Sequence, residues 1–287
     1  MPRLAYVNGR YVPHRGASVH IEDRGYQFAD GVYEVAPVAN GVVVDEELHL
    51  DRLERSLREL RIPMPMKRAA LKLVSHELAR RNGLTYGFVY MQVTRGVAPR
   101  DHKFPKSARP ALVMTTRQLK PASAKALAEG IAVITVPDIR WQRRDIKSTA
   151  LLPNCLAKQA AAEAGAAEAW MVDPDGSVTE GSSTNAWIVT REGRVVTRKA
   201  THEILNGITR QVLLRVIAEN GLTLEERPFT VDEAYRAKEA FLTSSTNFVM
   251  PITRIDAHSV GNGQPGEITG KLRRAYIATF APGGGVP

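Results

Sequence analysis

The sequence predicts a two-domain protein of α+β, or mixed α/β, architecture. The chain has 287 residues, and at about 150 residues per domain this length suggests two domains. Segments with the period of strands mingle with segments of helical spacing, without the strict alternation of a doubly wound sheet. Residues 118–128, a mixture of Lys, Pro, Ala and Ser, are typical of a linker. We therefore expect a small α+β domain in 1–117, an interdomain linker in 118–128 and a larger domain in 129–281.

The N-terminal domain opens with a hairpin signal. Residues 4–12 alternate around Asn8-Gly9, a dipeptide that favours a type I′ turn. Apolar residues at helical spacing predict helices over 45–61 and 67–82, and Gly83 stands where a left-handed residue ends the second helix. Strands are expected at 86–94 and 110–116.

The C-terminal domain mixes the same two patterns. Asp173–Gly176 has turn composition, Gly221 ends a predicted helix, and Thr230 with Glu233 has the spacing of a capping box. The expected strands lie at 131–136, 169–172, 185–189, 194–197 and 241–244, and the expected helices at 156–164, 209–220 and 266–280. Residues 282–287 are rich in Gly and Pro, so a disordered tail is expected.

Composition restricts the class of protein. A net charge of +9 attracts anionic substrates and cofactors, but the basic residues are scattered, so a non-catalytic nucleic-acid-binding protein is only a remote alternative. No apolar run reaches the ~20 residues that cross a bilayer, and the single Cys155 fits a reducing cytoplasm. No GxGxxG, Walker, paired CxxC or HExxH motif is present. We expect a cytoplasmic protein that binds neither metal, membrane nor nucleic acid.

Five segments place polar groups at predicted strand ends or turns. They are Glu22–Val35 (EDRGYQFADGVYEV), Gln92–His102 (QVTRGVAPRDH), Asp145–Ser148 (DIKS), Glu180–Asn185 (EGSSTN) and Gly207–Arg210 (GITR). Each has an ordinary structural explanation by itself. Together and in this order they resemble the fold-type IV pyridoxal-phosphate enzymes, and among these the D-amino acid aminotransferases, over nearly the whole chain. The resemblance implies a two-domain fold-type IV transaminase whose C-terminal domain binds pyridoxal 5′-phosphate.

The resemblance also assigns roles to residues. Lys147 would hold the cofactor as a Schiff base and move a proton from the substrate α-carbon, and Glu180 would keep the pyridine nitrogen protonated. Tyr33, Arg100 and His102 would hold the substrate carboxylate. The other cofactor-binding residues would be Arg52, Ser182, Leu205, Ile208, Thr209, Ser244 and Ser245. Arg144, outside this set, is expected to be a solvated surface arginine.

The loop Arg100-Asp101-His102 carries the expected stereospecificity, because related subfamilies share the lysine and the glutamate but generally differ in this loop. The expected reaction passes the amino group of a D-amino acid, such as D-alanine or D-glutamate, to an α-keto acid such as 2-oxoglutarate. In the family the loop comes from the neighbouring subunit, so a homodimer is expected. An (R)-amine transaminase, a branched-chain L-amino acid transaminase and an aminodeoxychorismate lyase stay open as alternatives of the same fold.

Overall fold

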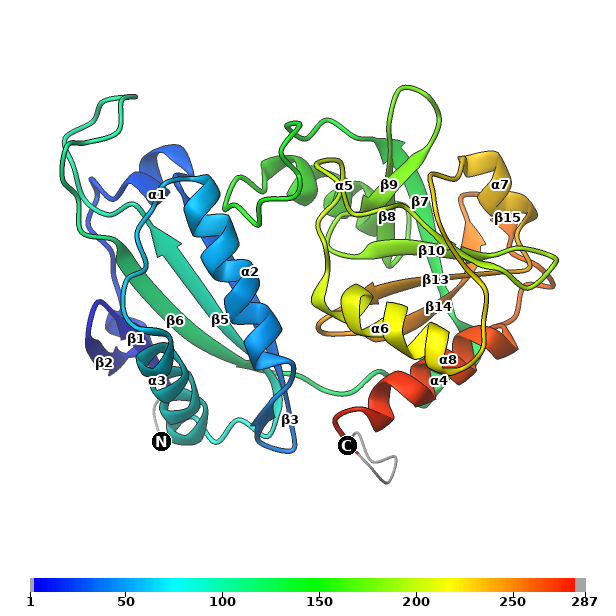
Figure 1. Ribbon diagram of the computed structural model, residues 1–287, viewed down its shortest axis with the longest axis horizontal. Coiled ribbons are helices and arrows are strands. Elements are labelled where there is room, and N and C mark those ends of the chain that lie inside the picture. Colours follow the sequence, from blue (N-terminus) through cyan, green and yellow to red (C-terminus); the bar gives the residue numbers. More distant parts are fainter. Residues whose placement is uncertain (1–2, 282–287) are drawn as a thin grey trace. The chain divides into compact units, whose positions relative to one another are not determined.

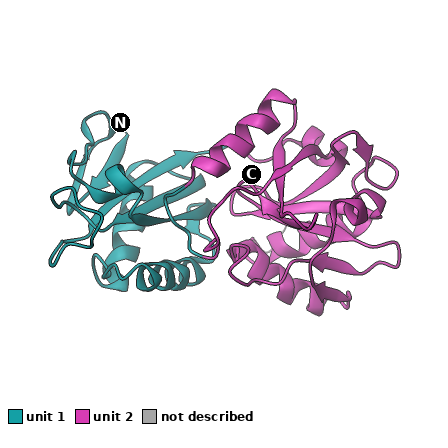
Figure 2. Ribbon diagram, turned by 90° about the horizontal axis from the view of Figure 1, so that it is seen from above, with its two compact units in different colours: residues 1–120, 146–150, 287 teal, residues 121–145, 151–286 magenta. Residues whose placement is uncertain are grey.

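The computed structural model describes residues 3–281, which form two compact units (Figure 2). Unit 1 contains the chain up to Lys120 together with Ile146–Ala150, and unit 2 contains Pro121–Asp145 and the chain from Leu151 onward. Each unit combines helices with a sheet, which confirms the predicted fold class. The predicted disordered tail, 282–287, lies outside the described residues.

Unit 1 is built on a six-stranded antiparallel sheet with the order β2-β1-β6-β5-β3-β4. Its elements are β1 (Leu4–Val7), β2 (Arg10–Pro13), the 3₁₀ helix η1 (His14–Gly16), α1 (Arg24–Phe28), β3 (Gly31–Ala39), β4 (Val42–Val43), α2 (Glu46–Glu59), α3 (Arg68–Arg81), β5 (Tyr86–Thr94) and β6 (Ala111–Gln118). Asn8 and Gly9 join β1 to β2 with φ angles of 46° and 97°. Both values are positive, as a type I′ turn requires, so the hairpin prediction is confirmed.

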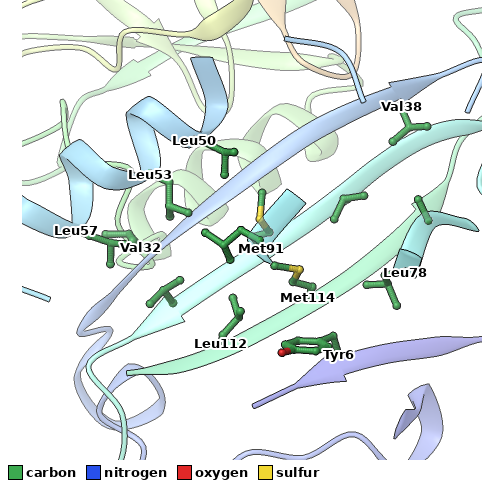
Figure 3. Close-up of a cluster of buried hydrophobic side chains, with 14 of the residues drawn as sticks. Tyr6, Val32, Val38, Leu50, Leu53, Leu57, Leu78, Met91, Leu112 and Met114 are labelled. Atoms are coloured by element: carbon green, nitrogen blue, oxygen red, sulfur yellow. The ribbon is translucent and has the colours of Figure 1, made fainter. Parts of the chain in front are cut away.

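The core of unit 1 lies between this sheet and the helices α2 and α3 (Figure 1). Leu50, Leu53 and Leu57 recur at helical spacing on α2 and face Met91 and Met114 of the sheet (Figure 3). Burial of each leucine contributes about 1.5–3 kcal/mol, so the stripe fixes α2 on the sheet. The polar side chains that α2 carries are thereby fixed as well.

Unit 2 is built on a nine-stranded mixed sheet with the order β12-β11-β10-β13-β14-β7-β8-β9, and β15 pairs with β14. The strands are β7 (Ile131–Pro137), β8 (Glu168–Val172), β9 (Val178–Gly181), β10 (Asn185–Val189), β11 (Val195–Thr197), β12 (Leu224–Glu226), β13 (Glu239–Ser244), β14 (Phe248–Ile255) and β15 (His258–Ser259). The helices are α4 (Ala124–Glu129), α5 (Leu152–Glu163), α6 (Ile208–Glu219), α7 (Val231–Arg236) and α8 (Glu267–Ala278).

One apolar core of unit 2 contains Trp170, Phe229, Leu242 and Met250, and α7 contributes Ala234 to it. Helix α5 packs on β8, whereas α6 and α8 pack on each other and on β13 (Figure 1). The start of α6 lies near the end of β13, because Gly207 contacts Asn185, which pairs with Thr243. Within residues 3–281, no helix is long and apolar enough to cross a membrane.

Several boundaries differ from the sequence-based prediction. The expected linker contains α4, which Ser123 caps by accepting a hydrogen bond from the Ala126 N–H at 3.0 Å. Helix α5 begins at Leu152 rather than at 156. Pro153 is tolerated in its first turn, because an N–H group there would have no acceptor within the helix. The sequence pattern does not predict strands β3, β9 and β14. They are buried on both faces over most of their length, so the alternation that marks a strand is hidden.

The segment Ile146–Ala150 belongs to unit 1, although the sequence placed it in the C-terminal domain. Its extended backbone runs beside β3: the Tyr33 N–H donates to the Lys147 carbonyl and the Thr149 N–H donates to the Gly31 carbonyl, both at 3.0 Å. Ile146 is buried in the same apolar cluster as the stripe on α2. These contacts are long-range in sequence, which is why the local pattern could not reveal them.

Candidate active site

Lys147 is held in unit 1 by its own backbone. Its carbonyl pairs with Tyr33 of β3, and its N–H lies 3.4 Å from the Ser56 hydroxyl oxygen on α2. The side chain is half-buried, and its Nζ lies 4.2 Å from the centre of the Tyr33 ring. The structure therefore brings together the predicted catalytic lysine and one predicted substrate-binding residue, with a cation–π contact between them.

The next residue of β3, Glu34, points to the opposite face of the strand and forms a buried ion pair that the sequence analysis missed. Arg52 donates from Nε and Nη2 to the two carboxylate oxygens, both at 2.8 Å, and His49 Nδ1 lies 2.7 Å from Oε2. His49 and Arg52 are three residues apart on α2 and thus share a face. Arg52, the predicted phosphate arginine, is therefore fixed in orientation by a carboxylate that is itself completely buried.

The charges in this cluster follow from their surroundings. Burial alone raises the pKa of Glu34, but the charge of Arg52 and the hydrogen bonds from Arg52 and His49 hold that pKa well below its ordinary value. Burial lowers the pKa of His49, which keeps its imidazole neutral. Because an ionised carboxylate only accepts, Nδ1 carries the imidazole proton and donates it to Glu34. A charged residue inside the apolar segment of β3 was the signal that could have revealed the cluster.

The predicted carboxylate-binding loop is exposed and rests on one aromatic ring of unit 1. The guanidinium of Arg100 lies 4.7 Å from the centre of the Phe28 ring, and the His102 ring lies 5.5 Å from it. Arg24 stacks on the same ring at 4.7 Å and donates from Nη1 to the Asp101 carbonyl at 2.5 Å. Arg100 and His102 are thus brought together on Phe28, whereas Lys147 contacts Tyr33.

Glu180 lies in the buried strand β9 of unit 2 and is held by three donors. They are Arg140 Nη1 at 2.5 Å, Asn185 Nδ2 at 3.0 Å and the Leu205 N–H at 3.1 Å. Burial raises the pKa of Glu180, and the guanidinium of Arg140 opposes that rise. The Leu205 N–H is shared between the two carboxylate oxygens, at 3.2 Å from Oε1 and 3.1 Å from Oε2, so the three donors together fix the orientation of the carboxylate. Leu205, expected beside the ring, contributes its backbone to this arrangement.

The predicted phosphate-binding residues of unit 2 lie close to this carboxylate. Gly207 is the N-cap of α6 and has no side-chain capping bond, and no acidic residue lies in the first turn. The N–H groups of Ile208 and Thr209 therefore have no side-chain acceptor from the cap, and a helix N-terminus of this kind favours a phosphate. The residues present fit the cofactor at both its ring nitrogen and its phosphate.

Asn185 connects the two parts of this half of the site. Its Nδ2 donates to Glu180 and also to the Leu205 carbonyl at 2.9 Å, and its Oδ1 lies against Gly207 so closely that a Cβ there would approach it to 2.2 Å. The register of β10 and β13 sets Asn185 opposite Thr243, directly before Ser244.

Two serines are already engaged within unit 2. The Ser244 hydroxyl oxygen accepts from the Asn247 N–H at 3.1 Å, and Ser245 follows it at the end of β13. The buried Ser182 hydroxyl donates to the carboxylate of Glu168. In the structure, Ser182 follows β9 and binds Glu168. Its role toward the cofactor stays a prediction.

Sequence reasoning missed Arg140, and it was wrong about Arg144. Arg140 follows β7 and is the strongest partner of Glu180. Arg144, expected in solvent, has a side chain only 9% exposed and forms ion pairs with Asp138 at 3.3 Å and Asp173 at 2.9 Å. The cluster of Asp and Arg that follows β7 was the available signal, but several of the pairing partners lie far apart in sequence.

Comparisons with known proteins agree with this geometry. The chain is 42% identical over 268 residues to the D-alanine aminotransferase of Bacillus licheniformis, covering 93% of this chain and 94% of that protein. It is 40% identical over 273 residues to the D-alanine aminotransferase of Listeria monocytogenes, covering 94% of each. Among solved structures, the branched-chain amino acid aminotransferase of Escherichia coli has the same fold, with a TM-score of 0.90, 22% identity and coverage of 98% and 96%.

The family model of amino-transferase class IV matches residues 31–255, which is most of the chain. Enzymes of this class use pyridoxal phosphate, so the expected cofactor and the expected class of enzyme are confirmed. The resemblance to D-amino acid aminotransferases is confirmed by the relatives above. On these grounds the chain belongs to the amino-transferase class IV family.

Proposed function

We propose that this enzyme transfers the amino group of a D-amino acid, such as D-alanine or D-glutamate, to an α-keto acid such as 2-oxoglutarate. The observation that carries the aminotransferase chemistry is Glu180, a buried carboxylate whose orientation is fixed by three donors. The D-specificity is supported by the two D-alanine aminotransferases and by the loop that contains Arg100 and His102.

When bound, pyridoxal phosphate supplies an aldehyde that joins to amines and a ring that withdraws electrons from the substrate α-carbon. Lys147 is the proposed amine to which it is joined, and the same Nζ would take the α-proton and return it. Glu180 would accept the hydrogen bond from the ring nitrogen and keep it protonated. Leu205 would pack on the ring, and the proposed phosphate ligands are Arg52, Ser182, Ile208, Thr209, Ser244 and Ser245.

The substrate carboxylate is an anion, and we assign it to Tyr33, Arg100 and His102. A guanidinium binds a carboxylate with two parallel hydrogen bonds, which fixes the orientation of the α-carbon. We further propose a homodimer in which this loop serves the neighbouring active site. Exposed apolar side chains near the loop support this, because Ile21, Tyr26 and Phe104 are 76%, 75% and 52% exposed and would be covered by a second subunit. The single Cys155 supports a cytoplasmic location.

An absorption spectrum before and after addition of substrate tests the reaction. The protein loaded with pyridoxal phosphate should show the visible band of the cofactor joined to lysine, and D-alanine should bleach it while L-alanine does not. Lys147→Ala should lack the band, whereas Lys125→Ala, at a lysine with 78% side-chain exposure in unit 2, should keep it. A band that responds only to L-amino acids or to amines would overturn the D-specificity. Absence of a band after loading would overturn the whole proposal.

Subunit mixing tests the shared site. Lys147→Ala and Arg100→Ala should each be inactive when pure. If the loop acts in the neighbouring site, their mixture should recover about a quarter of the wild-type activity, because half of the dimers are mixed and each has one complete site. A mixture that exchanges subunits and stays inactive would show that the loop acts within its own subunit.

A further inference from the structure

Glu180 is one end of a charge ladder, a continuous series of ion pairs within unit 2. The ladder consists of Glu180, Arg140, Asp138, Arg144, Asp173, Arg198 and Glu203. Acidic and basic side chains alternate along it, with N···O distances between 2.5 and 3.4 Å. All its members are largely buried except Glu203, whose side chain is 51% exposed. The ladder therefore runs from the proposed cofactor carboxylate to the surface of the unit.

Arg140 links Glu180 to the rest of the ladder, because its guanidinium bridges two carboxylates. Its Nη1 donates to Glu180, while Nε and Nη2 donate to the two oxygens of Asp138 at 3.0 and 2.7 Å. Only a planar guanidinium offers donors in this fork, so a lysine would keep the charge and lose the bridge. The side chain is 8% exposed, and water therefore screens these charges only weakly.

Asp138 balances Arg140 and is itself held on several sides. Its Oδ2 also accepts from the Thr179 hydroxyl at 2.7 Å and pairs with Arg144 at 3.3 Å. Burial raises the pKa of Asp138, yet the hydrogen bonds and charge of Arg140 bring it below its ordinary value, so Asp138 is ionised. Its negative charge in turn raises the pKa of Glu180, which Arg140 lowers. Arg140 and Asp138 thus act on Glu180 in opposite directions.

The net charge of the ladder favours a positive charge on the cofactor ring. Four carboxylates alternate with three guanidiniums, which leaves one negative charge. A protonated ring nitrogen beside Glu180 would balance it. A proton between a carboxylate and a ring nitrogen stays on the nitrogen only if the carboxylate is the more acidic partner, and a guanidinium on the far side of that carboxylate makes it more acidic.

From this geometry we propose that Arg140 is a positioning residue that keeps Glu180 ionised, so that the shared proton resides on the cofactor ring nitrogen, and that Asp138 sets the strength of this effect. The inference rests on the proposed function, because it needs the cofactor ring at Glu180. The inference concerns whether Glu180 or the ring nitrogen holds the shared proton. An ion pair with a purely structural role would not change the position of this proton.

The test loads the full-length protein with ¹⁵N-labelled pyridoxal phosphate and measures the ring-nitrogen chemical shift as a function of pH. Wild type should show a protonated nitrogen at neutral pH. Arg140→Gln should show an unprotonated nitrogen and a kcat lower by roughly 10- to 100-fold. Arg140→Lys should restore protonation, because it restores the charge. Arg194→Gln, which breaks an exposed ion pair with Glu225 in the same unit, should leave the shift unchanged.

Asp138→Asn provides a second arm if Arg140→Gln does not fold. Removal of this negative charge leaves the guanidinium unopposed and makes Glu180 more acidic, so the ring nitrogen should keep the shared proton to a higher pH than in wild type. An unchanged ring-nitrogen titration in folded Asp138→Asn, or a protonated nitrogen in folded Arg140→Gln, would overturn the inference. Failure of wild type to bind the cofactor, or to protonate the ring, would instead overturn the proposed function.

Discussion

Replacement of Glu34 by alanine tests how Arg52 is held. The variant removes the carboxylate that accepts two hydrogen bonds from Arg52 and one from His49, and with it the negative charge that faces the buried guanidinium. Loss of one partner of a buried ion pair costs about 3–5 kcal/mol. That is a large share of the ~5–15 kcal/mol by which a protein is stable, so unit 1 should unfold far more readily.

The assay must report on unit 1. All three tryptophans, Trp141, Trp170 and Trp187, lie in unit 2, so their fluorescence would not follow the change. Hydrogen exchange measured on peptides from α2 and β3 should show the loss of protection directly. Glu77→Ala is a matched control, because Glu77 also accepts from two arginines of unit 1, Arg80 and Arg81, but it does so in solvent and should matter much less.

A second measurement separates stability from cofactor binding. If Arg52 binds the phosphate, Glu34→Ala should weaken the binding of pyridoxal phosphate by roughly 10- to 100-fold, as expected for a charge-assisted hydrogen bond. It should weaken the binding of pyridoxal, which has no phosphate, much less. Equal losses for both compounds would show that Glu34 acts on the fold of the site and not through Arg52. Unchanged exchange on α2 would refute the energetic argument itself.

Three further predictions follow from the same structure. Because the pKa of Glu34 is depressed in the folded protein, the difference in unfolding free energy between wild type and Glu34→Gln should be constant above about pH 5. This difference should shrink as the pH falls below the ordinary carboxyl pKa of about 4.3. Urea denaturation at several pH values would measure it. Phe28→Leu removes the ring under the carboxylate-binding loop and should raise KM for D-alanine about 2- to 5-fold with little change in kcat; an unchanged KM would contradict this. Gly207→Ala should drive a methyl group into Asn185 and abolish cofactor retention on gel filtration, whereas Gly16→Ala, where nothing lies within 4 Å, should not.

Local signals in the sequence were enough to predict the elements that depend on neighbouring residues. The turn at Asn8-Gly9 and the left-handed residues Gly83 and Gly221 have the positive φ that their positions in the pattern require. Thr230 caps α7 by accepting from the Glu233 N–H, as the capping-box spacing predicts. Strands β3 and β9 were not recognised, because strands buried on both faces lack the alternation that marks an exposed edge or face.

The same distinction applies to the site. The resemblance pointed to Lys147 and Glu180, whose roles stay predictions, and the sequence placed the start of α6 within one residue of Ile208. Their partners were not, because Arg140 is 40 residues from Glu180 and Glu34 is 18 residues from Arg52. A charge buried by tertiary structure has no local signature, and these pairings depend on strand order and on the side of the sheet that a helix covers.

The return of Ile146–Ala150 to unit 1 means that neither unit corresponds to one continuous stretch of the gene. A fragment that ends at Lys120 would lack Lys147 together with the backbone that pairs with β3, and a fragment that starts at Pro121 would contain the lysine without that strand. During synthesis, unit 1 stays incomplete until the ribosome has added residues of unit 2. A single crossover after Lys120 therefore cannot exchange a whole unit between homologues. A chimaera that keeps Lys147 with unit 1 needs three junctions, after residues 120, 145 and 150.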